Sequence, residues 1–208
     1  MTQKTERFRK MIYRRRSVRK YRQDRIPQGD ILKMIEAAKV APSAKNRQPW
    51  KFIIYSGNDK EAFLNIMERG IEREIKSPKL PESAFGIEDA KNTLRIMREA
   101  PITVCVIDPD GFSPFESLKA DQRFKEINST LSIGAAVENL ILKATELGYG
   151  TSWIGNTCFA YQELMEELKV NGQLVCAIAV GIPAESPEAR PRKPLDEIVE
   201  FRGDWENV

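Results

Sequence analysis

Residues 41–50 read Ala-Pro-Ser-Ala-Lys-Asn-Arg-Gln-Pro-Trp, a polar turn held between two prolines and closed by a tryptophan. Proline fixes φ and pushes the preceding residue out of the α region, so a helix ends before this turn and the backbone that follows is stiff. A plain helix-to-strand connection explains the prolines and Trp50, which serves as a core anchor. It does not explain Ser43, Asn46 and Gln48, whose hydroxyl and amide groups can bind the polar edge of a flat heterocycle.

Helical and β-rich patterns extend from this turn in both directions. Patterns typical of helices cover residues 6–16, 31–38, 59–76, 87–99, 129–147 and 160–169. Patterns typical of strands cover residues 50–55, 102–107, 151–155 and 174–182. The 129–147 helix is apolar nearly all round, as expected in a core or a subunit interface. Residues 77–86 and 112–126 carry no clear pattern, and we expect loops there, the second of them a loop or a flap.

The composition limits the kinds of chemistry that side chains can supply. The 208 residues are 41% hydrophobic and 30% charged, which suits one globular domain over residues 1–208. No apolar run approaches the roughly 20 residues that cross a bilayer, and no secretory signal is evident, so we expect a cytoplasmic protein without membrane contact. The sequence has no histidine and three scattered cysteines, which exclude the usual Ser-His-Asp and Cys-His sites and predict no metal centre. Any enzymatic chemistry is therefore expected to come from a bound cofactor.

Two cationic segments stand near opposite ends of the chain. Residues 14–19 read Arg-Arg-Arg-Ser-Val-Arg, and residues 190–193 read Arg-Pro-Arg-Lys. Guanidinium groups match phosphate oxygens in a bidentate way, so these segments together suit a phosphorylated cofactor. A basic run is also typical of a solvated surface or of an arm that touches nucleic acid, and the run alone does not separate these readings.

With these segments the chain resembles the nitroreductase family of flavin mononucleotide (FMN) oxidoreductases, nearly end to end. The stretches that carry the resemblance, in order, are residues 15–19, 41–50, 100–102, 134–142, 147–155, 181–183 and 192–195. The resemblance implies an α+β fold with a mixed, mainly antiparallel sheet flanked by helices. It also implies an intertwined homodimer with the long central helix at its interface and two FMN sites between the subunits.

The resemblance further implies a set of FMN-binding residues. Residues from one subunit would hold the phosphate and the pyrimidine edge: Arg15, Arg16, Ser17 and Arg19, completed by Arg190, Arg192 and Lys193. Residues from the opposite subunit would reach the same flavin: Pro42, Ser43, Ala44 and Asn46, with Gln48 as a further contact. Backbone amides would face the ring around N5: those near Ile154, Gly155 and Asn156.

The implied activity is hydride transfer from NADH or NADPH through flavin N5 to nitroaromatics, quinones or similar small acceptors, by a ping-pong route. No side chain is then catalytic, since the flavin is the reactive centre. Some family members carry an Asn and a Lys beside the flavin where this chain aligns Thr93 and Ile96. Asn92 or Arg95 would substitute only after a register shift.

The sequence leaves several functions open. A flavoenzyme of the same fold can instead be a dehalogenase, an oxidase of peptide-derived heterocycles or a flavin-cleaving enzyme. A flavin carrier without turnover and a nucleic-acid-binding module are also compatible with the sequence, although we expect a small-molecule electron acceptor and no nucleic-acid partner. Residues 77–86 and 112–126 usually border the substrate pocket in the family, and Phe112, Phe115 and Phe124 either line that pocket or fill core.

Overall fold

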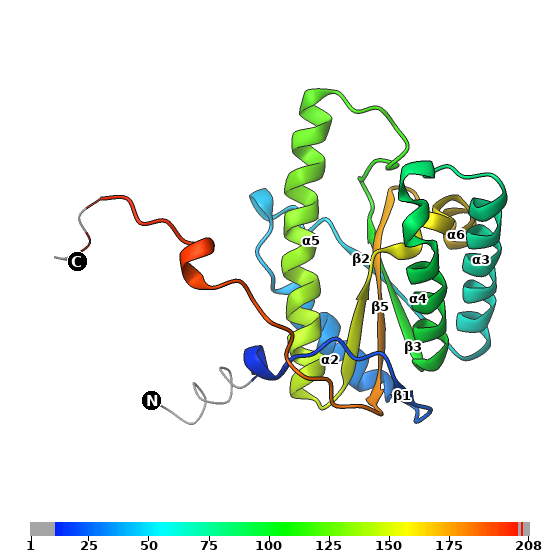
Figure 1. Ribbon diagram of the computed structural model, residues 1–208, viewed down its shortest axis with the longest axis horizontal. Helices are drawn as coiled ribbons and strands as arrows, with labels where there is room; N and C mark the ends of the chain where they lie inside the picture. Colours follow the sequence, from blue (N-terminus) through cyan, green and yellow to red (C-terminus); the bar gives the residue numbers. More distant parts are fainter. Residues whose placement is uncertain (1–10, 204, 206–208) are drawn as a thin grey trace.

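The computed structural model of the protein describes residues 11–203 and 205 (Figure 1). Its helices are α2 (Gln28–Lys39), α3 (Gly57–Lys76), α4 (Ile87–Glu99), α5 (Ala120–Glu146) and α6 (Tyr161–Leu168). Its strands are β1 (Tyr21–Arg22), β2 (Lys51–Ser56), β3 (Ile102–Asp108), β4 (Gly150–Ile154) and β5 (Gln173–Pro183). Four short 3₁₀ helices join them: η1 (Ala44–Asn46), η2 (Pro81–Gly86), η3 (Asn156–Ala160) and η4 (Leu195–Glu197). Residues 11–14 are helical, and the rest of the predicted 6–16 helix up to residue 10 lies outside the described residues.

The five strands form one sheet in which every ladder is antiparallel. β3 lies between β2 and β5, and the other side of β5 pairs with both β4 and β1. An isolated parallel bridge between Ser17 and Thr151 adds the N-terminal segment to the outer side of β4. The predicted α+β fold with a mixed, mainly antiparallel sheet is therefore confirmed.

Helices cover both faces of the sheet, so β3 is buried along its whole length. α3, α4 and α6 pack on the face that carries Cys105 and Ile107. α2 and α5 pack on the opposite face, which carries Val104 and Val106 (Figure 1). Successive side chains of a strand point to opposite faces of the sheet. Because helices cover both faces, apolar residues are favoured at successive positions of β3. None of the described helices is both long enough and apolar enough to span a bilayer.

Two stretches expected to be loops are partly helical. α5 begins at Ala120, so residues 120–126 form its first turns rather than a loop or flap. The backbone amide of Lys119 donates to Gln122 Oε1 at 2.9 Å, which caps this end of the helix. These turns are charged and solvent-exposed, and they lack the apolar stripe that predicts a helix. Within residues 77–86, η2 begins at Pro81, where proline suits the first turn.

After β5 the chain runs past the base of α5 and away from the helices (Figure 1). We call residues 187–203 and 205 the C-terminal arm. The arm carries five large apolar or aromatic side chains that are mostly exposed: Leu195, Ile198, Val199, Phe201 and Trp205. Such a row of exposed apolar groups is unusual on a free surface and is typical of a segment that meets a partner.

Candidate functional site

A cavity of about 730 Å³ lies between the N-terminal segment, the base of α5 and the start of the C-terminal arm. We call it the arginine cavity, because five guanidinium groups line it: Arg15, Arg16, Arg19, Arg190 and Arg192. The described lining residues include two carboxylates, Glu138 and Glu188, so the wall carries an excess of positive charge. The two cationic segments therefore meet in space although they are more than 160 residues apart in sequence. Ser17 also lines the cavity, whereas Lys193 is exposed outside it.

The backbone of residues 15–19 is fixed by the edge of the sheet. The amide of Val18 donates to the carbonyl of Thr151 at 2.9 Å, and the buried hydroxyl of Tyr21 donates to the carbonyl of Val18 at 2.6 Å. A Cβ at Gly150 would come within 2.8 Å of the Val18 side chain, so glycine is needed for this close approach. Burial raises the pKa of Tyr21 above its usual range, which keeps its hydroxyl a donor. The arginine side chains thus project from a rigid backbone.

Most of these guanidinium groups are held by carbonyl oxygens rather than neutralised by acids. Arg16 Nη1 donates to the carbonyls of Tyr13 and Arg15 at 2.7 and 2.8 Å. Arg19 Nη1 donates to the carbonyl of Ser17 at 3.2 Å. Carbonyl partners orient a guanidinium but leave its full charge in place. Within the described residues, this leaves net positive charge available for an anion such as a phosphate group.

The turn at residues 43–48 holds an unusual concentration of backbone strain. Lys45, Asn46 and Gln48 have positive φ angles of 54°, 53° and 50°, although none is glycine. The left-handed region costs roughly 1 kcal/mol or more for each such residue. Ser43 Oγ accepts the amide of Gln48 at 3.0 Å, and Ser132 on α5 accepts a second backbone amide of the turn at 3.2 Å. Strain that neighbouring contacts maintain is typical of ligand-binding segments.

This turn does not reach the arginine cavity of its own chain. None of its five predicted contacts lines the cavity: Pro42, Ser43, Ala44, Asn46 and Gln48. The turn meets α5 at Ser132, whereas Arg15 meets α5 at Glu138. Six helical residues separate these points by about 9 Å along the axis and place them on different faces. Within one chain, the turn residues and the residues of the arginine cavity therefore form two separate groups.

The third predicted group lies at the end of β4. Ile154 is the last residue of β4, and Gly155 and Asn156 lead into η3. The Ser17–Thr151 bridge lies four residues before Gly155, or about 13 Å along the strand. None of the three lines the arginine cavity, which lies farther toward the base of α5. The edge of β4 thus connects the cationic cavity to the turn at Gly155.

The outer face of α4 does not point toward this turn. Asn156 Nδ2 donates to Thr93 Oγ1 at 3.1 Å, so Thr93 faces the start of η3, just after β4. Arg95 instead donates to Asn92 Oδ1 at 2.9 Å and pairs with Glu99 on the exposed side of the helix. Within this chain, Asn92 and Arg95 therefore bond to each other on the exposed side of α4, away from the Asn156–Thr93 contact.

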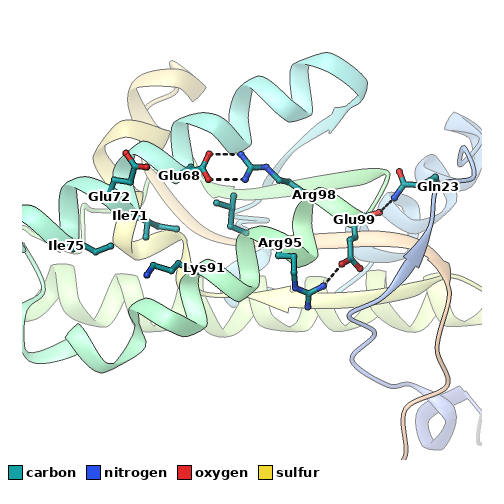
Figure 2. A pocket seen from close by; sticks show the side chains of 10 residues that line it. Gln23, Glu68, Ile71, Glu72, Ile75, Lys91, Arg95, Arg98 and Glu99 are labelled. Carbon is teal, nitrogen blue, oxygen red and sulfur yellow. Dashed lines mark hydrogen bonds and ion pairs between the residues drawn. The ribbon is translucent and has the colours of Figure 1, made fainter.

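A second cavity, of about 540 Å³, lies between α3 and α4 (Figure 2). Ile71, Ile75 and Leu94 supply its apolar lining. Figure 2 shows that its arginines are paired with carboxylates: Arg98 with Glu68 at 2.8 Å and Arg95 with Glu99. This cavity therefore lacks the uncompensated arginine charge of the first one.

The cysteines offer no ready nucleophile. Burial raises the pKa of the Cys176 thiol to about 12, and it raises the pKa of Cys105 and Cys158 above the usual thiol range. A thiolate is therefore not available near neutral pH at these positions. With no histidine in the chain, these groups leave redox chemistry to a bound group.

The profile of the nitroreductase family matches residues 12–182, which include both the N-terminal arginines and the β4–η3 turn. The chain belongs to the nitroreductase family. Among its relatives is the Bacillus subtilis (strain 168) protein named "Putative NAD(P)H nitroreductase YfhC". That protein is 31% identical over 190 residues, which cover 90% of each chain.

Solved nitroreductase-like structures share the fold over nearly the whole chain. A BluB-like flavoprotein from Clostridium difficile 630 has a TM-score of 0.79 and 29% identity, covering 94% of this chain and 98% of its own. The FMN-dependent nitroreductase NfnB from Mycobacterium smegmatis, in complex with NADPH, has a TM-score of 0.71 and covers 96% of this chain and 99% of its own. At 18% identity, the second likeness shows the fold alone.

Proposed function

We propose that this member of the nitroreductase family is an FMN-dependent NAD(P)H oxidoreductase that reduces nitroaromatics, quinones or similar small acceptors. The observation that carries the proposal is the meeting of guanidinium groups from both ends of the chain at one cavity. When bound, FMN would supply hydride chemistry at N5 between NADH or NADPH and the acceptor, in the ping-pong route of the proposal. The relative named as an NAD(P)H nitroreductase, together with the NADPH complex of an FMN-dependent nitroreductase of the same fold, supports this assignment.

The donor set of the arginine cavity fits the phosphate of FMN. Arg15, Arg16, Ser17 and Arg19 offer hydroxyl and guanidinium donors from one wall, and the start of the C-terminal arm offers Arg190 and Arg192 from the other. A phosphate monoester carries about −1.5 to −2 charge at pH 7, which this excess of positive charge can neutralise. Lys193 follows Arg192 in sequence, but it does not line the cavity.

The edge of β4 supports the remaining contacts that we propose for the flavin. We assign the backbone amides near Ile154, Gly155 and Asn156 to the ring around N5, because β4 leads from the bridged Ser17 to this turn. These amides would offer hydrogen-bond donors to the ring, and the cationic groups of residues 15–19 would favour negative charge at its pyrimidine edge. The Asn156–Thr93 hydrogen bond holds this turn against α4. No side chain then has to transfer a proton near neutral pH.

The enzyme is a homodimer in this proposal, and a partner copy completes each site. The turn that carries Pro42, Ser43, Ala44, Asn46 and Gln48 is strained and lies away from the cavity of its own chain. The exposed face of α5 presents Phe124, Ile127 and Leu131, at 67%, 47% and 69% exposure. This face and the apolar C-terminal arm each supply exposed apolar surface that a second copy would bury. We retain a cytoplasmic location as a prediction.

The visible spectrum of the purified protein tests the function. We expect a yellow protein that bleaches when NADH or NADPH is added without oxygen and regains its colour when a quinone or nitroaromatic follows. A flavin that stays oxidised with both nucleotides would indicate a carrier without turnover. A colourless protein that does not bind added FMN would contradict the proposal altogether.

A further inference from the structure

Glu138 places a carboxylate in the wall of the arginine cavity. It projects from α5, and its Oε1 lies 3.6 Å from Nε of Arg15. The side chain is 46% exposed, so the ion pair is open to solvent and to a ligand. Glu138 is thus the carboxylate that faces an arginine directly within the described part of this cavity.

Packing does not explain this carboxylate. The neighbouring α5 residues Ala136, Val137 and Leu140 are buried in the core, whereas Glu138 points away from it into the cavity. The ion pair itself contributes little to folding, because partly exposed pairs are worth about 0–1 kcal/mol. A neutral residue of similar size would therefore fold as well at this position.

Electrostatics makes the carboxylate costly for anion binding. A phosphate that contacts Arg15 must come close to Glu138, and like charges at such separations repel. Glu138 also competes with the phosphate for the Arg15 guanidinium. If a neutral residue replaced Glu138, the described lining residues would carry five guanidinium groups and one carboxylate, that of Glu188.

We propose that Glu138 is a positioning residue that holds Arg15 against the cavity wall and limits the affinity of the site for the phosphate group of its flavin. The proposal rests on the proposed function, since it assigns the arginine cavity to the FMN phosphate. It predicts that the natural protein binds FMN less tightly than its arginines allow. Glu138 therefore sets how strongly the site prefers FMN over riboflavin, the same ring system without the phosphate.

The test compares Glu138→Gln with the wild-type protein by titrating FMN and riboflavin separately into flavin-free protein. Riboflavin reports every ring contact but not the phosphate, so the ratio of the two dissociation constants isolates the phosphate site. We expect Glu138→Gln to bind FMN roughly tenfold more tightly, with riboflavin affinity unchanged. Glu138→Asp keeps the charge and should stay close to wild type. Glu36→Gln removes the same charge from the exposed surface of α2 and should change neither constant.

The outcomes separate this inference from the function on which it rests. Tighter FMN binding with constant riboflavin binding supports the inference. Equal tightening of both ligands, or unchanged or weaker FMN binding by Glu138→Gln, would overturn it even if the wild-type protein is an active flavoenzyme. If Glu138→Gln does not fold, Glu138→Ala replaces it, and the ratio of its FMN and riboflavin dissociation constants is compared with that of the wild-type protein. Failure of the wild-type protein to bind either flavin would instead contradict the proposed function.

Discussion

At the scale of single residues, Arg16 and Arg19 of the arginine cavity differ in their partners from Arg95 and Arg98 of the second cavity. Arg16 and Arg19 are oriented by carbonyl oxygens, whereas Arg98 and Arg95 are paired with carboxylates. The charge of a guanidinium that is paired with a carboxylate is already compensated, so it attracts a further anion less strongly. A guanidinium that is oriented only by carbonyls, on a rigid backbone, is prepared to bind one.

The first prediction concerns Arg19, which lines the cavity and donates to the carbonyl of Ser17. We expect Arg19→Ala to weaken FMN binding by roughly tenfold to a hundredfold, because a charge-assisted hydrogen bond is worth about 1.5–3 kcal/mol. Fluorescence titration of FMN measures the change. Arg95→Ala removes an arginine of the second cavity and should leave the affinity as it is. Equal FMN affinity of Arg19→Ala and the wild-type protein would count against the phosphate site.

A second prediction concerns Asp108, a buried carboxyl at the end of β3. Burial raises its pKa, although the amide of Asp110 donates to it at 3.1 Å. A raised pKa in the folded state means that the stability contributed by the protonated form is lost as the pH rises through that value. We therefore expect Asp108→Asn to be more stable than wild type at pH 7. The difference should shrink as the pH falls toward the ordinary carboxyl pKa of 3.8.

Thermal or urea unfolding of both proteins at several pH values measures this difference. Asp110→Asn serves as the control, because Asp110 is exposed on the same turn. A stability difference for Asp108→Asn that does not change with pH would contradict the argument from burial.

At the scale of elements, α4 is held in place by a buried lysine from α3. Lys60 Nζ donates to the carbonyls of Met97 and Arg98 at 3.2 and 2.9 Å, and also to that of Ala100. The last carbonyls of a helix lack partners within it, so the ammonium group caps this end. Because α4 also supports the β4–η3 turn through Thr93, the cap stabilises one wall of the proposed flavin site.

The third prediction is that Lys60→Met destabilises the protein by about 2 kcal/mol or more, since buried carbonyls lose their donor. Urea unfolding gives the change in the free energy of unfolding. Lys76→Met, at the exposed end of the same helix, should change it by less than about 0.5 kcal/mol. Similar losses for the two variants would show that the cap contributes nothing specific.

Sequence patterns predicted those elements whose apolar periodicity reflects burial. Phe63, Met67 and Ile71 recur at helical spacing and mark the buried face of α3, whereas Ile75, on the same stripe, lines the open cavity between α3 and α4 and is 53% exposed. The first turns of α5 were not predicted, because helical turns exposed to solvent need no apolar stripe and therefore leave no periodic pattern in the sequence. The left-handed backbone at Lys45 and Asn46 also escaped it, since no glycine signals it. The contact between Asn156 and Thr93 depends on how α4 lies against β4, which no local pattern encodes.

At the scale of the whole molecule, both ends of the chain build one site. The cavity needs the N-terminal segment and the start of the C-terminal arm, which only the complete fold brings together (Figure 1). The family resemblance supplied the roles of these residues, and their meeting at one cavity supplies the physical reason for the arrangement. The same arm then carries the apolar side chains that a second copy would cover.

The fourth prediction tests separately the two roles proposed for the C-terminal arm, FMN binding and dimerisation. We expect a chain that ends at residue 186 to lose both FMN and dimerisation, because it lacks the arm's arginines and its apolar residues. Replacing Arg190 and Arg192 by Ala should weaken FMN binding but leave a dimer. Replacing Leu195 and Ile198 by Ser should weaken the dimer instead. Analytical ultracentrifugation and flavin absorbance report the two properties, and a truncated chain that remains a flavin-loaded dimer would contradict the assignment.

The central claim is that guanidinium groups from both ends of the chain hold one flavin phosphate. A crystal structure of the FMN-loaded protein tests it most directly. We predict that the phosphate oxygens lie within about 3 Å of guanidinium nitrogens both from residues 15–19 and from residues 190–192. A phosphate bound elsewhere, or contacted by only one of these segments, would contradict the account.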